Sequence, residues 1–423
     1  MVSLAGTQLD YCVYQCFNPS MSALDIFTIL NEVLIATATF FFNVIAIIGD
    51  GAQCNRQFQR RYFTSGENFD QHMIHPVWNE PIYFISDPSH VVKKIVSSTS
   101  SSNRKIFKSV NGIDRVVSLS AMYKLWESFN DNSGLNRFKS FKTIDFIKNS
   151  FQAMRVGPCI KVLGPKMLEV IDMALFYKNS YEEFLANTNN AGKSNPFEKY
   201  KDADMYLGWK EVAEKFSGLF SILNSTENRL NTTSYSSNLN YLREFYNWFK
   251  DWKDECVARR KLTLRDKHTA YDAMTGFFSA EASEDCLSMV QGIIALTTYY
   301  CNNKNNASRY FFFLPRRISQ DLVENAFSRI RLAIGHARLD HITTYNAIVE
   351  GSAIKETKAS TRSMQKRNAA GAMEEYKPDD VKNCVEYASS RIKESLNRRH
   401  LYYNEDNPFK WSTLSGIKLF VKL

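Results

Sequence analysis

The stretch FNVIAIIGDG, residues 42–51, decides how the fold is interpreted. Residues 42–48 are apolar apart from Asn43 and rich in β-branched side chains, which is typical of a strand buried on both faces. The Gly49-Asp50-Gly51 sequence that follows is a turn signal. We therefore predict a buried central strand at 42–48 with an acidic residue directly behind it.

The segment before this strand favours a helix. In residues 21–37 the apolar side chains recur at spacings of three and four, which is the period of one helix face. Residues 33–48 together form an apolar run that could be interpreted as a membrane helix. The run is shorter than the roughly 20 residues that a membrane span requires, and Asn43 interrupts it. A buried helix followed by a strand is the favoured interpretation, and no membrane partner is expected.

Further along the chain, short strands flank a long helical region. Residues 82–86 and 309–314 are expected to be strands, ended by Asp87-Pro88 and by Pro315. A basic helix is expected at 52–65, and the serine-rich 97–104 is a candidate boundary. Between about 105 and 300 the pattern is mostly helical. The helices expected beyond that boundary are 143–156, 161–177, 209–223, 240–258 and 319–334.

Bulk composition limits the class of protein. The chain has 423 residues, of which 44% are hydrophobic and 23% charged, so it can bury a large core in two or three domains. Its net charge of +9 is compatible with a polyanionic partner but is also common in ordinary cytosolic proteins. Its eight cysteines form no C-x-x-C pair, which argues against a zinc site and favours a reducing compartment.

Three acidic residues could carry chemistry. Asp50 and Asp87 each follow an expected strand, and Glu324 lies on the polar face of the helix expected at 319–334. Open α/β sheets bind ligands at the carboxyl ends of their strands, and carboxylate oxygens suit Mg²⁺. Two such metal ions can assist phosphodiester chemistry. Each residue also has a structural interpretation, because Asp-Gly and Asp-Pro are turn formers and a lone glutamate usually faces solvent.

The most specific motif of the chain is Ser319-Gln320-Asp321-x-x-Glu324-Asn325-x-Phe327-Ser328-x-Ile330-Arg331. It resembles a block of the P-element-type transposases, the family that includes the THAP-domain transposases. Two shorter blocks precede it in the family's order, Asp50-Gly51-Ala52-x-x-Asn55-Arg56 and Asp87-Pro88-x-His90-x-x-Lys93. Residues 151–156 are weakly similar to the start of the family's GTP-binding insertion.

The resemblance implies an α/β, RNase-H-like core split by a large, mainly α-helical insertion. Residues 21–97 and 309–350 would form the core, 98–308 the GTP-binding-type insertion, and 351–423 a linker and basic C-terminal region. Asp50 and Glu324 would be the second and third acids of a DDE catalytic triad and hold Mg²⁺. Asp321 would contact the guanine nucleotide of GTP, and Asp87 and His90 would line the site or support it. The implied partner is DNA, namely transposon ends, in the nucleus, with homo-oligomerisation left open.

The chain also departs from the family pattern. The first catalytic aspartate and its hairpin are expected to be absent, since only Asp10 and Asp25 precede the predicted strand closely, and an unpaired sheet edge would result. The zinc-bearing module and the coiled coil of the family have no match either. Gly192-Lys193-Ser194 lacks the leading glycine of a phosphate-binding loop, since residue 187 is asparagine. We therefore expect no strand-transfer activity in this chain as written.

Three hypotheses remain open from the sequence. The first is a DDE-type polynucleotidyl transferase relic that uses Mg²⁺ and GTP, and the second is a non-catalytic, domesticated protein that binds nucleic acid and GTP. The third is an unrelated helical scaffold, which would lack the strands at 42–48, 82–86 and 309–314. The aromatic stretch 241–252 could stack on bases, although at helical spacing such rings more often form a core.

Overall fold

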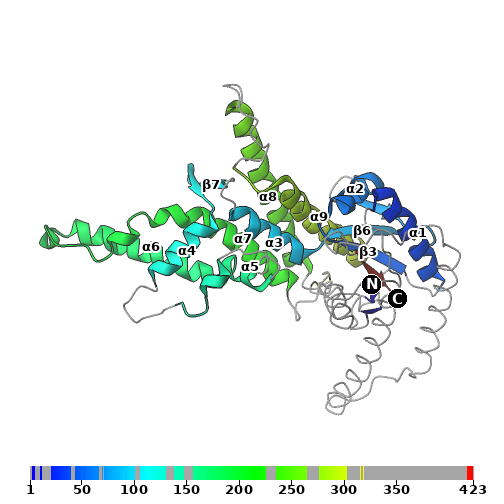
Figure 1. Cartoon of the computed structure of the whole chain (residues 1–423), viewed down its shortest axis with the longest axis horizontal. Helices are drawn as coiled ribbons and strands as arrows, with labels where there is room; N and C mark the ends of the chain where they lie inside the picture. The colour runs from blue at the N-terminus through cyan, green and yellow to red at the C-terminus, as the bar shows by residue number, and fades with distance from the viewer. Residues whose placement is uncertain are drawn as a thin grey trace, which may run out of the picture.

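The computed structural model describes most of the chain up to residue 302. The described residues are 2–4, 10–11, 21–39, 43–65, 69, 71–100, 105–129, 138–146, 156–224, 235–263, 276–302, 315, 318 and 417–422. The fold is mixed α/β. A sheet occupies one end of the molecule, beside both chain ends, and helices extend away from it (Figure 1).

The predicted central strand is the middle of this sheet. β3 (Asn43–Gly49) pairs in parallel with β6 (Pro81–Ser86), and six of its seven residues are buried. On its other side it pairs antiparallel with β9 (Ile417–Lys422). Among the described residues the strand order is β2-β1-β9-β3-β6-β5-β4. The remaining strands of this sheet are β1 (Val2–Leu4), β2 (Asp10–Tyr11), β4 (Thr64–Ser65) and β5 (Gln71–Ile74).

Helices cover both faces of the β3–β6 pair. Alternate residues of a strand point to opposite faces, and a register irregularity between Val44 and Ala46 shifts this alternation by one residue. Val44 and Ile47 therefore share one face and pack with α1 (Ala23–Ala38) and α2 (Gln53–Tyr62). Ile45 and Ile48 instead join a larger apolar cluster. That cluster includes the buried faces of α3 (Pro88–Thr99) and α9 (Ala280–Asn302). The predicted helix is confirmed as α1, and Ser22 and Asp25 form a capping box at its start.

The larger cluster continues without a break into the helical end of the molecule. Trp209, Phe249 and Trp252 lie in it and are almost completely buried. The predicted core role of the aromatic stretch is therefore confirmed for its rings at 245, 249 and 252. The helices of this end are α4 (Leu119–Ser128), α5 (Val156–Val162), α6 (Pro165–Ala186), α7 (Leu207–Leu223) and α8 (Tyr235–Thr263).

The structure corrects several predictions. The candidate boundary at 97–104 is wrong at its start, because α3 continues to Thr99 with its apolar face on the core. The mostly helical region contains a hairpin of β7 (Phe107–Val110) and β8 (Ile113–Val116), whose Asn111-Gly112 turn has positive φ at both residues. The helix predicted at 143–156 is a short 3-10 turn, Thr143–Asp145, followed by residues outside the described range.

Two further corrections concern a helix break and a sheet edge. α5 ends at Val162, and α6 begins at Pro165 with Gly164 as its N-cap. The helix predicted at 161–177 is therefore interrupted at this point. The sequence implied an unpaired sheet edge, but β3 is paired on both sides, with β6 and with β9. The strand predicted at 309–314 and the helix predicted at 319–334 lie outside the described residues.

The apolar run at 33–48 is divided between two elements. Its first part ends α1 and its last part lies in β3. Among the helices that the structure describes, none combines the length and apolar character needed to cross a membrane. The interpretation as a buried helix and strand is therefore confirmed.

A buried histidine in the β5–β6 connection makes the stability of this fold depend on pH. His75 Nδ1 accepts the backbone N–H groups of Val77 and Trp78, at 3.1 and 3.3 Å. A protonated Nδ1 could accept neither bond. Burial lowers the pKa of His75 to about 4, against a smaller opposing effect of the Glu80 charge.

We expect acid to destabilise the protein through His75. The unfolded histidine has a pKa of about 6.5, so unfolding takes up a proton below that pH, and stability falls as pH decreases from about 6.5 towards 4. The loss between about pH 7.5 and about pH 5.5 is roughly 1 kcal/mol. His75→Asn keeps an acceptor for the loop and removes this dependence. Urea unfolding of both proteins at the two pH values measures the difference, and identical pH profiles would contradict the assignment.

Candidate active site

The first element of the candidate site is the turn that follows β3. The Asp50 carboxylate is half-buried, and its Oδ1 accepts the Ala52 backbone N–H at 3.0 Å and the Asn55 amide Nδ2 at 2.8 Å. Asn55 Nδ2 also contacts the Asp50 carbonyl oxygen, at 3.3 Å. Because Asn55 is completely buried in the first turns of α2, it fixes the Asp50 side chain against the helix. The turn therefore presents a carboxylate of defined orientation at the end of a buried strand.

The second acid of the sequence pattern has a structural partner. Asp87 follows β6, and its backbone N–H bonds to the Gly49 carbonyl, so the two acids follow neighbouring parallel strands as predicted. Asp87 is the N-cap of α3, and its Oδ2 accepts the His90 backbone N–H at 3.0 Å. The His90 ring Nδ1 lies 2.7 Å from the same oxygen. Asp87 therefore starts α3 and orients His90.

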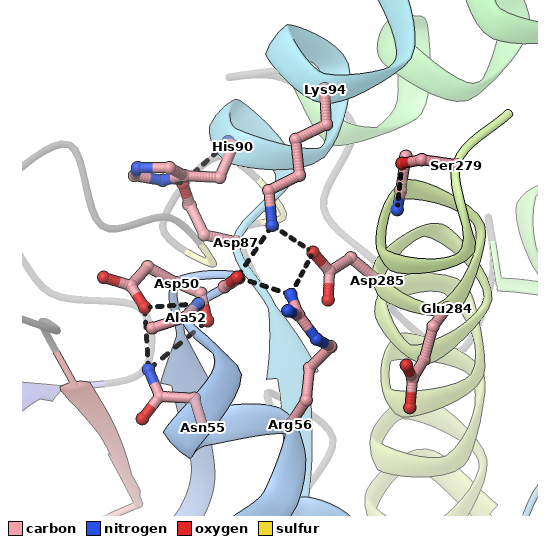
Figure 2. A network of polar contacts seen from close by, with 12 residues as sticks. Asp50, Ala52, Asn55, Arg56, Asp87, His90, Lys94, Ser279, Glu284 and Asp285 are labelled. Carbon is pink, nitrogen blue, oxygen red and sulfur yellow. Dashed lines mark hydrogen bonds and ion pairs between the residues drawn. The ribbon is translucent and has the colours of Figure 1, made fainter. Parts of the chain in front are cut away.

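A third group of charges lies on the far side of the Asp50 turn. Asp285, in the first turns of α9, accepts a bond from Lys94 Nζ at 2.5 Å and lies 3.5 Å from Arg56 Nη1. Both cations also donate to the carbonyl oxygen of Gly51, Lys94 at 2.8 Å. Figure 2 shows Lys94, Arg56 and Asp285 converging beside the turn, with Asp50 and Asn55 on its other side. Segments from α2, α3 and α9 thus meet at one backbone carbonyl.

Gly51 is required by this arrangement. A Cβ atom at this position would lie 1.8 Å from Lys94 Nζ and 2.2 Å from Asp285 Oδ2. Any side chain would therefore displace one of the two charged groups. The glycine between Asp50 and Ala52 allows the charges to approach the backbone closely.

A comparison with solved structures identifies the fold. The chain matches the structure described as "Drosophila P element transposase strand transfer complex" with a TM-score of 0.50 and 16% sequence identity, over 75% of this chain. The chain shares the fold of this P element transposase. The match covers 62% of the transposase chain, so this protein spans less than two thirds of it. No family model matches the sequence, and no curated protein does.

The P element transposase fold removes one of the three sequence hypotheses. Strands are present at 43–49 and 81–86, close to the predicted ranges, so an unrelated helical scaffold is excluded. The resemblance to P-element-type transposases, which was based on short blocks, is supported by the three-dimensional structure.

The other predicted site residues of the P element transposase pattern lie outside the described residues. These residues are Glu324 and Asp321. The closest described position is Ile318, which is buried. Ile318 and Pro315 line a small pocket of about 20 Å³ together with Pro88, Ser89 and Val92 of α3. The chain therefore reaches the first turn of α3 six residues before Glu324.

Sequence reasoning missed Asp285 and Lys94. The signal that could have revealed Asp285 is its place on α9, where it lies in the buried stripe with Ala282 and Met289. A carboxylate on an apolar helix face requires a partner from elsewhere in the fold. Lys94 is the neighbour of Lys93, which the sequence block included, and the structure assigns the contact with the turn to Lys94.

Mg²⁺ needs oxygen ligands, and the described residues supply part of such a set. The Asp50 carboxylate is a hard oxygen donor, and Mg²⁺ is commonly held by one or two carboxylates together with substrate phosphates and water. Within the described residues no cluster of three or more His, Cys, Asp or Glu side chains could hold a metal ion by itself. Asp50 therefore fits as one ligand, and a second protein ligand would have to come from the rest of the chain.

Proposed function

We propose that this chain is a transposase-derived protein that binds DNA and a divalent cation at the Asp50 turn of an RNase-H-like core. The observation that carries the proposal is the position of Asp50. It follows a central strand beside a parallel neighbour, and two donors hold its carboxylate. Ligands of open α/β sheets bind at this end of the strands. The fold match to the P element transposase supports the same reaction class.

In this proposal Glu324 is the second carboxylate of the site. Ile318 is anchored against α3 close to Asp87, and six residues span at most about 20 Å, so Glu324 is within reach of the Asp50 turn. The metal ion would polarise a phosphodiester oxygen or a bound water. Asp50 and Glu324 would position it, and Asn55 would keep the Asp50 carboxylate in place.

The wider parts of the proposal rest on the resemblance. DNA with transposon ends, the nucleus, and the division into core and insertion are proposed on that basis, with homo-oligomerisation left open. GTP binding is proposed on the same basis, with Asp321 as the residue that would contact the nucleotide. Gly192-Lys193-Ser194 lies in an exposed loop after a 3-10 turn, and the residues that follow do not start an α-helix. A P-loop needs a helix N-terminus at that point, so these three residues do not fit a phosphate site.

Metal binding tests the proposal. Asp50→Asn keeps an oxygen that can accept the bonds from Ala52 and Asn55, so the turn is expected to fold, but it removes the charge that a cation needs. We expect the affinity for Mn²⁺, a spectroscopic substitute for Mg²⁺, to fall at least about tenfold. Electron paramagnetic resonance of free Mn²⁺ measures the affinity. Glu324→Gln is expected to have an effect of the same order.

Asp87→Asn is the matched control, because Asp87 follows the neighbouring strand at the corresponding position. Asparagine is also a good N-cap, so α3 is expected to persist. This variant should bind Mn²⁺ like the wild type. Equal affinities of wild type and Asp50→Asn would refute the proposed site. A loss in Asp87→Asn instead would move the metal to the other strand. Cleavage of a DNA substrate by the wild type, measured alongside, separates a catalytic site from a binding site.

A further inference from the structure

Three segments distant in sequence meet at the Gly51 carbonyl. Lys94 of α3 and Arg56 of α2 both donate to this oxygen. Asp285 of α9 accepts from both cations, and lies 191 and 229 residues from them along the chain. Gly51 is the residue after Asp50, so the contact is one peptide unit away from the proposed metal ligand. In Figure 2 the two cations lie between the turn and Asp285.

Because Asp285 is buried, its carboxylate depends on its two cationic partners. Its side chain is 2% exposed, and its second carboxylate oxygen, Oδ1, has no hydrogen-bond partner among the described residues. A buried carboxylate is costly unless cations compensate it, so Asp285 holds Lys94 and Arg56 close. Their positions in turn fix the Gly51 carbonyl. A Cβ at Gly51 would clash with Lys94 Nζ and Asp285 Oδ2, so this contact requires glycine at position 51.

We propose that Asp285 is a positioning residue that sets the orientation of Asp50 through Lys94, Arg56 and the Gly51 carbonyl. The metal-binding part of this inference rests on the proposed function, whereas the part that concerns the turn does not. Residues that orient metal ligands without touching the metal commonly change its affinity about 10- to 100-fold. Through Asp285, α9 contributes to the site although none of its residues follows a strand of the sheet.

Asp285 affects the turn because its charge balances the two cations that bind the Gly51 carbonyl oxygen. Within the turn, Asp50 Oδ1 accepts the Ala52 N–H. Lys94 and Arg56 of the neighbouring helices hold the turn through its Gly51 carbonyl. Without the Asp285 charge, two positive groups would converge on a single carbonyl and repel each other. The Lys94 side chain is 30% exposed and can move into solvent. The turn would then lose its outer anchor, and the Asp50 carboxylate would sample more orientations.

The test compares Asp285→Asn with the wild type in the full chain. The first measurement is hydrogen exchange of the Ala52 amide, which reports the turn without any metal. We expect its exchange to become faster, while amides in β3 exchange as before. The second measurement is the Mn²⁺ affinity, which we expect to fall about tenfold.

Glu284→Gln is the matched control. Glu284 precedes Asp285 on α9 and pairs with Arg60 of α2, but neither partner contacts Gly51. This substitution also removes one carboxylate that joins α9 to α2. We expect wild-type exchange at Ala52 and wild-type Mn²⁺ affinity.

A double variant, Lys94→Met with Asp285→Asn, separates positioning from simple charge compensation. It removes one charge of each sign, so it is expected to fold even if Asp285→Asn alone does not. The Lys94 bond to Gly51 is absent in it, so Ala52 should still exchange fast and Mn²⁺ should still bind weakly. Recovery of both properties would overturn the inference, because Asp285 would then only neutralise Lys94. Restoration of slow Ala52 exchange by Asp285→Glu would support it.

The two proposals can fail separately. If Asp50→Asn binds Mn²⁺ as tightly as the wild type, the proposed function fails, and the Ala52 exchange rate in Asp285→Asn still decides the inference. If Asp50→Asn loses affinity while folded Asp285→Asn keeps both wild-type exchange and wild-type affinity, the positioning role is refuted and the metal site stands.

Discussion

Replacing Gly292 with alanine is expected to lower the free energy of unfolding by about 3 kcal/mol, the upper part of the usual range for overpacking. Gly292 lies in α9 where this helix crosses β6. A Cβ atom there would be 2.1 Å from the carbonyl oxygen of Phe84 and 2.9 Å from Ile85 Cγ1. The first of these atoms is backbone in a paired strand and cannot rotate away. The added methyl group must therefore push α9 off the sheet.

Chemical unfolding followed by circular dichroism measures this change. Gly157→Ala is the control, because Gly157 also lies in a helix, α5, and a Cβ atom there would meet nothing within 4 Å. That substitution should be neutral or stabilise the protein by up to about 1 kcal/mol, the usual helix preference of alanine over glycine. If Gly292→Ala matched Gly157→Ala, the close contact between α9 and β6 would be disproved. Gly292→Ala should also weaken Mn²⁺ binding, since Asp285 lies on the displaced helix.

Replacing Trp209 with alanine is expected to destabilise the helical end of the molecule by about 4 kcal/mol. The Trp209 side chain is completely buried at the start of α7, within the continuous apolar cluster. Its indole Nε1 donates to the carbonyl oxygen of Val162 at 3.0 Å, which satisfies a group at the end of α5. The substitution therefore removes a large apolar volume and leaves a buried carbonyl without its donor.

Trp209→Phe separates these two contributions. Phenylalanine fills most of the volume but cannot donate to Val162, so its cost should be near the penalty of one unsatisfied polar group, about 1 to 3 kcal/mol. Urea unfolding monitored by circular dichroism measures both variants. Equal losses for alanine and phenylalanine would mean that the hydrogen bond, and not the packing, holds α7 to α5.

The sequence predicted the elements whose signal is local and strong. β3 was evident because its apolar, β-branched run ends in a turn sequence. α8 was evident because its buried rings, Phe245, Phe249 and Trp252, recur at helical spacing. The strand β9 was missed, since its partner β3 lies more than 350 residues earlier and no local pattern specifies so distant a pairing. The β7–β8 hairpin was missed because seven of its eight strand residues are half-buried or exposed and form no alternating apolar face.

The sequence predicted only those residues of the candidate site that directly follow a strand. Asp50 could be selected because an acid after a buried strand is a recognisable pattern, and the sequence block around it included Asn55 and Arg56. The reason for those two residues is structural, since one holds the Asp50 carboxylate and the other the Gly51 carbonyl. Asp285 could not be linked to them, because the link exists only when α9 packs beside α2 and α3.

One face of the sheet shares its apolar interior with the helical end of the molecule. Met289 and Ile293 of α9 belong to the same cluster as Ile45 and Ile85 of the sheet. A gene deletion that removed the helices would expose this face of the strands and favour aggregation. Natural selection for a soluble chain would then retain the helical region even in a lineage that no longer used its chemistry.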